Sequence, residues 1–197
     1  MKTYVATKNR GKLLEIGAMF EESALEVATY AAYRDPQEGE ESYVENALIK
    51  ARALRQQLAS AGINDAAVLA DDSGIEIDAF GGKPGVLSAR YGGESTPWPQ
   101  RRAHLLAELQ NASDRGARFV CVMAFIYPDG REIVVRGEVD GKIPLQECGD
   151  GGFGYDPVFF YPPIGRTFAQ IPEYEKNRLS HRGRAARALG EALERDA

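Results

Sequence analysis

The order of apolar and polar residues predicts a strand and then a helix at the start of the chain. The run Tyr4-Val5-Ala6 is apolar and predicts a short buried strand. Apolar residues then recur at helical spacing from about Lys12 to Glu22. The members of this apolar stripe are Leu13, Leu14, Ile16 and Phe20. A polar loop is expected between the strand and the helix.

A second helix is predicted after an acidic loop at residues 35–42. Ser42 and Glu45 stand three residues apart, which is the spacing of a capping box at the first turn of a helix. The apolar stripe of this helix comprises Val44, Ala47, Leu48, Ala51, Leu54 and Leu58. The cap gives Glu45 a sufficient structural role, so its carboxylate needs no functional explanation.

The stretch Ala70-Asp71-Asp72-Ser73-Gly74 is predicted to form a strand-to-strand turn. It joins the apolar pair Val68-Leu69 to the alternating run Ile75–Phe80. Two adjacent carboxylates oppose each other's ionisation, so such a pair usually has a cation, a proton or solvent beside it. A solvated turn, in which Asp and Ser bond to their own backbone, is the competing interpretation. The stretch alone does not decide between the two.

The second half of the chain predicts an antiparallel meander, which would make the sheet mixed. Arg118–Tyr127 is apolar on both faces and predicts a central strand. Pro128-Asp129-Gly130 is expected to turn it into Arg131–Val139. Asp140-Gly141 is expected to turn that strand into a third one near Lys142–Leu145.

Two further helices are expected, one from about Pro99 to Gln110 and one capped by Ser180. The first would pack Ala103, Leu106 and Leu109, with His104 beside this stripe in a structural role. The apolar positions of the second are Ala185, Ala186, Leu189 and Leu193.

Charge and composition exclude several classes of partner. The net charge of −5 argues against a nucleic-acid or anionic-membrane binder, which needs a basic surface. No apolar run approaches the roughly 20 residues that span a bilayer, and a strand-like run begins at once, so we expect neither a membrane segment nor a signal peptide. Two cysteines make no disulfide framework, and two histidines show no zinc spacing. A cytoplasmic, reducing compartment is therefore expected.

The loop Thr7-Lys8-Asn9-Arg10-Gly11-Lys12 has the features of a phosphate-binding site. It lies at a predicted helix N-terminus, where backbone N–H groups and the positive end of the helix dipole meet. Lys8, Arg10 and Lys12 add three cations there. It is not a Walker P-loop, because Ala6 and Leu13 stand where that motif needs Gly and Ser or Thr. A solvated basic loop is the alternative.

The acidic loop and the last helix offer two more charged sites. Glu38, Glu40 and Glu41 supply oxygen ligands that suit a divalent cation near the phosphate-binding loop, although a solvated loop fits the composition equally well. His181 and Arg182 follow Ser180 at a predicted helix N-terminus, which favours an anion. A solvated charged face is the alternative there.

The run Gly149-Asp150-Gly151-Gly152-Phe153-Gly154 has the letters of a dinucleotide-binding fingerprint. Its context is wrong, because the apolar run Val158–Tyr161 follows where that motif needs a helix. The loop nevertheless brings Phe153, Tyr155 and Asp156 together, which suits stacking on a flat ring and accepting its hydrogen bonds.

These segments, in this order, resemble the family of inosine and xanthosine triphosphate pyrophosphatases, enzymes that remove noncanonical purine nucleotides. The resemblance covers essentially the whole chain. Its motifs are Thr7–Lys12, Glu45-Asn46-Ala47 with Lys50-Ala51, Ala70–Gly74, Gly81–Gly85, Ser88–Tyr91, Phe153–Pro157, Glu175-Lys176 and Ser180–Gly183.

The resemblance implies an α/β fold, with a long twisted mixed sheet and flanking helices that form two lobes around a central cleft. It implies that residues 1–197 form one such domain and that the protein is a homodimer. The implied reaction is hydrolysis of inosine, deoxyinosine and xanthosine triphosphates (ITP, dITP and XTP) to monophosphate and pyrophosphate with Mg²⁺.

The resemblance also implies roles for individual residues. Asp72 would accept a proton and bind the metal, and Ser73 would contact substrate. The triphosphate would be held by Thr7, Asn9 and Lys12, assisted by Lys176. The first three belong to the Thr7–Lys12 loop, which also contains Lys8, Arg10 and Gly11. The base would be held by Phe153, Gly154, Tyr155, Asp156, His181 and Arg182. Glu38 matches the family's acidic metal position by spacing, with Glu40 and Glu41 close beside it.

The sequence departs from the family pattern at two places. Lys8 replaces the small residue usual between Thr7 and Asn9, and the helix after the long loop begins with Pro97-Trp98-Pro99. The first change bears on the geometry of the phosphate-binding loop. The second is interpreted as a change of surface only.

Three alternatives remain beside this interpretation. Asp72-Ser73-Gly74 has the letters of an aspartic protease active turn, but that fold is all-β, and the helical stripe at Val44–Leu58 opposes it. A nucleotide-binding module without activity is a second alternative, which Asp72 and the lysines disfavour. A pyrophosphatase for pyrimidine or modified nucleotides is the third.

Overall fold

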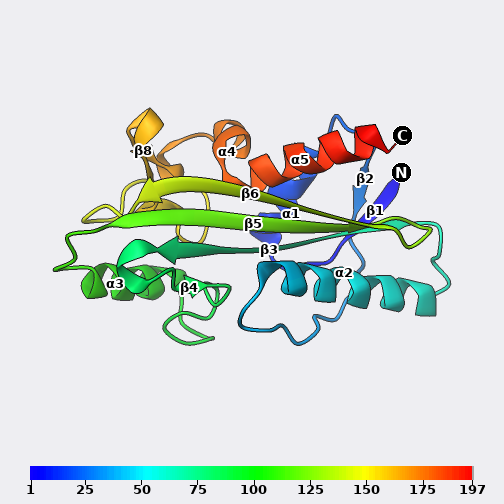
Figure 1. Cartoon of the computed structure of the whole chain (residues 1–197), viewed down its shortest axis with the longest axis horizontal. Coiled ribbons are helices and arrows are strands. Elements are labelled where there is room, and N and C mark those ends of the chain that lie inside the picture. Colours follow the sequence, from blue (N-terminus) through cyan, green and yellow to red (C-terminus); the bar gives the residue numbers. More distant parts are fainter. Residues whose placement is uncertain (197) are drawn as a thin grey trace. The chain divides into compact units, whose positions relative to one another are not determined.

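The computed structural model describes residues 1–196 and contains a mixed sheet with helices packed against it (Figure 1). The strands are β1 (Lys2–Val5), β2 (Glu26–Ala28), β3 (Ala67–Ile77), β4 (Pro84–Gly85), β5 (Gly116–Ile126), β6 (Glu132–Lys142), β7 (Phe160–Tyr161) and β8 (Arg166–Thr167). The helices are α1 (Arg10–Met19), α2 (Tyr43–Ser60), α3 (Trp98–Glu108), α4 (Glu173–Leu179) and α5 (His181–Arg195). Within residues 1–196, none of the helices has the length and apolar character that crossing a membrane requires.

The strand order is β2-β1-β3-β5-β6-β7-β8, and β4 pairs with β3 off this path. β1 is parallel to both of its neighbours, with Thr3 opposite Val27 of β2 and Ala67 of β3. β4 is antiparallel to β3, and β7 is antiparallel to both β6 and β8. The expected mixed α/β sheet is therefore confirmed, and β5 is central as predicted.

The chain divides into two compact units, and the three longest strands contribute to both. Unit 1 contains Met1–Asp72, Cys121–Gly137 and the described chain from Arg182 onward. Unit 2 contains Ser73–Val120 and Glu138–His181. The division of β3 falls between Asp72 and Ser73.

Unit 1 packs α1 and α5 on one face of its part of the sheet and α2 on the other (Figure 1). Ile16 of α1 and Leu189 of α5 join one apolar cluster with Leu69 of β3 and Phe125 of β5. The buried apolar positions of α2 are Tyr43, at 7 % exposure, and Ala47, Ala51, Leu54 and Leu58, all at 0 %. The apolar face of α2, which the period of about 3.6 residues in the sequence predicted, therefore packs against the sheet.

Unit 2 has its own apolar core. Leu105 and Leu109 from the α3 region pack with Ile75 and Ile77 of β3. Phe119, Phe159 and Phe168 stack together in the same cluster, with centroid distances of 4.3 to 6.2 Å. The loop residues of this unit are thereby anchored to the strands that carry them.

Two strand predictions were wrong. Asp71 and Asp72 lie inside β3, which runs without a turn for 11 residues from Ala67 to Ile77. Asp140-Gly141 does not reverse the chain either, because β6 continues through it to Lys142 and no separate third strand forms. A methyl group added at Gly141 would lie 2.6 Å from the Phe159 ring, so glycine serves close packing there.

Three positions of the predicted helical stripes were also wrong. Leu14 of α1 is 59 % exposed, Val44 of α2 is 39 % exposed, and Ala103 of α3 is exposed as well. In α3 the buried positions are Arg101 and Leu105, followed by Leu109 at the helix end. The long Arg101 side chain is buried because its guanidinium donates to three backbone carbonyls, those of Tyr91, Gly93 and Thr96.

Gly74→Ala tests the close approach of β4 to β3. The added methyl would lie 2.1 Å from the Gly85 carbonyl oxygen, so the backbone must shift, and we expect a loss of about 1–3 kcal/mol in the free energy of unfolding. Gly17→Ala in α1 is the matched control, since nothing lies within 4 Å of its added methyl, and it should gain up to about 1 kcal/mol. Urea unfolding measures both, and equal effects would contradict the packing described.

Candidate functional site

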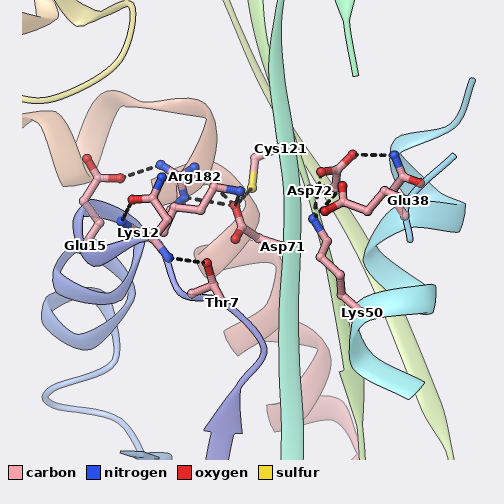
Figure 2. A network of polar contacts seen from close by, with 11 residues as sticks. Thr7, Lys12, Glu15, Glu38, Lys50, Asp71, Asp72, Cys121 and Arg182 are labelled. Atoms are coloured by element: carbon pink, nitrogen blue, oxygen red, sulfur yellow. Dashed lines mark hydrogen bonds and ion pairs between the residues drawn. The ribbon is translucent and has the colours of Figure 1, made fainter. Parts of the chain in front are cut away.

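The two adjacent carboxylates of β3 point to opposite faces of the sheet. Side chains alternate along a strand, so Asp71 faces α1 and α5 whereas Asp72 faces α2. Figure 2 shows the two groups diverging from the strand. Both side chains are buried, at 1 % and 5 % exposure. Each carboxylate therefore has its own set of partners, and the expected repulsion within a shared turn does not arise.

The Asp72 cluster consists of Asp72, Glu38, Asn46 and Lys50. The Lys50 ammonium donates to Asp72 Oδ1 at 2.8 Å and lies 3.5 Å from Glu38 Oε2. Asn46 Nδ2 donates to Asp72 Oδ2 at 3.2 Å. Burial lowers the pKa of Lys50, but the nearby carboxylates, Asp72 foremost, outweigh it and raise that pKa. One charged ammonium is thus shared by two carboxylates.

Asn46 also attaches the acidic loop to this cluster. Its Oδ1 accepts from the Gly39 N–H at 2.7 Å, and its Nδ2 donates to the Gly39 carbonyl at 3.2 Å. The neighbouring Glu38 is consequently held near Lys50, while Glu40 and Glu41 are exposed. Of the three acidic residues that the sequence left open, the structure brings only Glu38 to Asp72.

Asn46 and Lys50 were not predicted as site residues from the sequence. They stand four residues apart on α2 and are 0 % and 6 % exposed, on the same face as Ala47, Ala51 and Leu54. A polar pair that continues an apolar helical stripe was the available signal. Such residues are buried only when they have partners, which here come from the sheet.

The Asp71 cluster consists of Asp71, Lys12, Glu15, Cys121 and Arg182. Lys12 Nζ lies 2.9 Å from Asp71 Oδ2, and Arg182 donates to the same oxygen through Nε and Nη2 at 3.3 and 3.2 Å. Arg182 Nη1 also donates to Glu15 Oε2. Burial alone would raise the pKa of Asp71, but the charges of Lys12 and Arg182 hold it well below its usual range.

Cys121 completes this buried cluster as a thiol. Its Sγ lies 3.9 Å from Asp71 Oδ2. Burial first, and then the Asp71 charge, raise the pKa of Cys121 to about 12. Its 0 % exposure makes it a small core residue.

The ion pairs of the two clusters differ in charge balance. In the Asp71 cluster, two cations (Lys12, Arg182) contact two carboxylates (Asp71, Glu15). In the Asp72 cluster, one cation (Lys50) contacts two carboxylates (Asp72, Glu38). The first set of contacts is balanced, and the second carries one negative charge in excess. A further cation is therefore favoured beside Asp72.

The Thr7–Lys12 loop forms the N-terminus of α1, which begins at Arg10, two residues earlier than expected. Asn9 is the N-cap, and its side chain accepts from Lys12 N–H at 3.2 Å. Thr7 Oγ1 accepts from Asn9 N–H at 3.1 Å. The Lys8 ammonium pairs with the Asp35 carboxylate at 3.2 Å, and both side chains are largely exposed. The loop is thus preformed, and Lys12 places its ammonium at Asp71.

Residues assigned to the base lie mainly in unit 2. Asp156 Oδ2 accepts from the Phe153 N–H at 2.7 Å and pairs with the buried ammonium of Lys176. That ammonium lies 4.7 Å from the Phe153 ring centroid. Lys176, expected to assist with the triphosphate, is therefore placed beside the proposed base residues.

Unit 2 contains three further residues that were predicted as site residues: Tyr155, Ser73 and His181. Tyr155 is 3 % exposed, and its hydroxyl donates to the Ser88 carbonyl at 2.9 Å, so it is a core residue. Ser73 follows Asp72 on β3 and is partly exposed. His181 stacks on Phe119 with a centroid distance of 4.5 Å. Arg182 follows it in sequence but makes its contacts in unit 1, at Asp71 and Glu15.

Among residues 1–196, no group of three or more His, Cys, Asp or Glu side chains forms a ready metal site. Two carboxylates and water or phosphate oxygens are the usual ligands of Mg²⁺. The Asp72 cluster fits that chemistry, because its two carboxylates already share a cation.

These features define a class of protein: a mixed α/β protein with an acidic central strand flanked by lysine-bearing helices. The chain belongs to the Ham1 family, whose sequence pattern matches residues 3–192. It is 43% identical over 196 residues to a dITP/XTP pyrophosphatase of Thermus thermophilus, covering 98% of this chain and 91% of that one.

Solved structures of the same family have the same fold. The Ham1 protein of Staphylococcus aureus superimposes with a TM-score of 0.83 at 34% identity, covering 100% of both chains. A HAM1 protein of Coxiella burnetii gives a TM-score of 0.84 at 33% identity, covering 99% of both.

Asp71→Asn tests the buried cluster. Removing one partner leaves Lys12 and Arg182 without their shared anion, so we expect a loss of about 3–5 kcal/mol at pH 7. Because the pKa of Asp71 is lower in the folded chain, its carboxylate stabilises the fold above the unfolded-state pKa of about 3.9, and this contribution is lost as pH falls further. The difference between wild type and variant should therefore shrink below about pH 4.

Urea unfolding between pH 3 and 7 measures this difference. Asp65→Asn, which alters an exposed carboxylate, serves as the control and should leave stability nearly unchanged. A difference between wild type and Asp71→Asn that stays constant across the pH range would contradict the assignment.

Proposed function

We propose that this chain hydrolyses noncanonical purine nucleoside triphosphates, namely ITP, dITP and XTP, to the monophosphate and pyrophosphate. Membership of the Ham1 family and the printed activity of the Thermus thermophilus relative support this proposal. The structural observation that carries it is the Asp72 cluster, in which Asp72 and Glu38 share the Lys50 ammonium. A clustered pair of carboxylates with one excess negative charge suits water activation beside a metal-bound phosphate.

Asp72 is the proposed proton acceptor. Its two oxygens each accept one hydrogen bond, from Lys50 and from Asn46, and a carboxylate has further lone pairs for a water molecule. These two donors fix the carboxylate plane on the rigid strand β3. An oriented carboxylate can accept the proton of water as it attacks the α phosphorus.

A divalent cation, Mg²⁺ in this proposal, would be held by Asp72 and Glu38. When bound, it offsets the negative charge that grows on the phosphates during hydrolysis. Lys50 already offers a positive charge at the same carboxylates, and so supports them in the absence of metal. The remaining ligands would be water and phosphate oxygens.

The triphosphate would be bound by the start of α1 and by Lys12. The helix N-terminus presents backbone N–H groups and a positive dipole end. Asn9 and Thr7 shape this terminus through their own hydrogen bonds, so the loop requires little reordering on binding. Lys12 would exchange part of its contact with Asp71 for phosphate.

The base would be recognised by unit 2 through Phe153 and its neighbours, together with His181 and Arg182. Stacking on Phe153 serves any purine, whereas hydrogen-bond donors select a 6-oxo group over a 6-amino group. Arg182 also balances Asp71 and Glu15, so its replacement would disturb the fold. Phe153 is therefore the cleaner position for testing base binding.

The proposal includes a homodimer, which the family resemblance implies, and the cytoplasmic location expected from the sequence. Light scattering of the purified chain measures the oligomeric state directly. A pyrophosphatase for pyrimidine or modified nucleotides is the rival function, and the substrate panel described next separates it.

Hydrolysis of a nucleotide panel, with pyrophosphate and orthophosphate measured separately, tests the function. We expect the highest kcat/KM on ITP, dITP and XTP, with pyrophosphate as product. Asp72→Asn keeps the shape of the side chain but removes its charge, so kcat should fall at least about a hundredfold. Its nucleotide binding should persist. Wild-type turnover in this variant, or a preference for pyrimidine substrates, would refute the proposal.

Glu38→Gln tests the metal ligand. Losing one carboxylate should raise the Mg²⁺ concentration that gives half-maximal activity by about tenfold, and chelation should abolish activity in all variants. Glu40→Gln is the matched control, because that side chain is exposed two residues away. The two variants are compared by titrating Mg²⁺ at fixed ITP. An identical response in both would remove Glu38 from the metal site.

A further inference from the structure

Helix α3 contacts the loop that carries Phe153 through two side chains. Arg102 Nη1 donates to the Gly154 carbonyl at 2.9 Å. A methyl group added at Gly154 would lie 3.7 Å from the Trp98 ring, an ordinary van der Waals distance, so the indole lies close beside this residue. Both contacts involve the residue directly after Phe153, and all four residues belong to unit 2.

Arg102 is itself held in place. Its Nε donates to Glu147 Oε2 at 2.9 Å, and its side chain is only 13 % exposed. Glu147 lies before the glycine-rich run and Gly154 lies at its end. One guanidinium therefore ties together both ends of this loop. Its planar fork supplies two separate donors at a fixed angle, which a lysine cannot reproduce.

Trp98 is fixed by contacts on other sides. The Arg101 guanidinium lies 5.1 Å from its ring, and the Tyr155 ring meets it edge to face at 5.2 Å. Arg101 is anchored to carbonyls of the preceding loop, including those of Gly93 and Thr96. The indole is thus held beside residues 154–155. In the Pro97-Trp98-Pro99 start of the helix, interpreted from sequence as a surface change, both prolines are exposed, but Trp98 is half-buried and packs beside this loop.

Gly154 needs this support because of its backbone. Its φ of +64° lies in the left-handed region, and Gly152 has a φ of +66°. Two such glycines flank Phe153, so the local chain does not by itself fix the direction of the ring. Asp156 holds the Phe153 N–H from one side. Arg102 donates to the carbonyl of the next residue, Gly154, and Trp98 lies close beside that residue.

We propose that Trp98 and Arg102 are positioning residues that orient the Phe153 loop for purine binding, so that α3 sets base affinity without contacting the reacting atoms. This inference rests on the proposed function, because it assigns the base to Phe153. A loop that is oriented in advance loses less conformational entropy when the base binds. Loss of the orientation should therefore appear in KM and in the preference for ITP, with kcat retained at saturation.

Arg102→Gln is the main test, with Arg102→Lys as the conservative variant. Arg118→Gln is the matched control, since Arg118 also pairs with acidic residues in unit 2, Asp140 and Glu138, but has no contact with the loop. We expect Arg102→Gln to raise KM for ITP about tenfold while kcat changes less than twofold. Its ratio of kcat/KM for ITP over ATP should fall, Arg102→Lys should be intermediate, and the control should match wild type.

Trp98 gives a second readout, because it is the single tryptophan of the chain. Titration with ITP in the presence of a chelator, which prevents turnover, should change its emission in wild type. Arg102→Gln should reach the same end point with a Kd about tenfold higher. A merely structural role would lower Tm or kcat and leave this Kd unchanged.

The outcomes separate the two proposals. If wild type hydrolyses ITP and Arg102→Gln has the wild-type KM and Kd, the positioning role is overturned while the proposed function stands. An equal rise of KM in Arg118→Gln overturns it as well. A wild-type chain that neither binds nor hydrolyses ITP overturns both.

Discussion

The structure depends on the alternation of β3, which sends two neighbouring carboxylates to opposite faces of one strand. Each would be costly to bury alone, because desolvation of an unpaired charge exceeds the worth of most single contacts. Asp71 is compensated by Lys12 and Arg182, and Asp72 by Lys50. The helices α1, α5 and α2 are therefore attached to the strand by charge as well as by apolar packing (Figure 2).

The two faces of the strand differ in the charge balance of their ion pairs. Around Asp71 the contacts pair two cations with two carboxylates, which makes these contacts balanced in charge and largely buried. Around Asp72 one cation meets two carboxylates, so the cluster favours a further positive charge. A balanced cluster fixes the strand in place, and the unbalanced one beside it contains Asp72, which we propose as the proton acceptor. The rigidity of Asp72 thus comes partly from a residue with no proposed part in the reaction.

Local signals in the sequence predicted local structure well. Ser42 caps α2 as expected, through its Oγ and the Glu45 N–H, and the apolar period of that helix faces the sheet. Asp71 and Asp72 were misplaced because Asp, Ser and Gly favour turns when judged alone, whereas their true partners lie far away in sequence. Arg182 is 111 residues from Asp71 and Lys50 is 22 residues from Asp72. No periodicity records such pairings, so Asn46 and Lys50, although they lie in a motif of the family resemblance, were not assigned to the site.

The same limit explains why the start of α3 was undervalued. Pro97-Trp98-Pro99 departs from the family pattern, and a tryptophan between prolines suggests an exposed helix entry when no partner is visible. The Trp98 ring meets the Tyr155 ring edge to face at 5.2 Å, and a methyl group added at Gly154 would lie 3.7 Å from the indole. Trp98 is far from residues 154 and 155 in the sequence, so no local periodicity records these contacts. Such contacts can position a loop although Trp98 itself belongs to none of the recognised motifs.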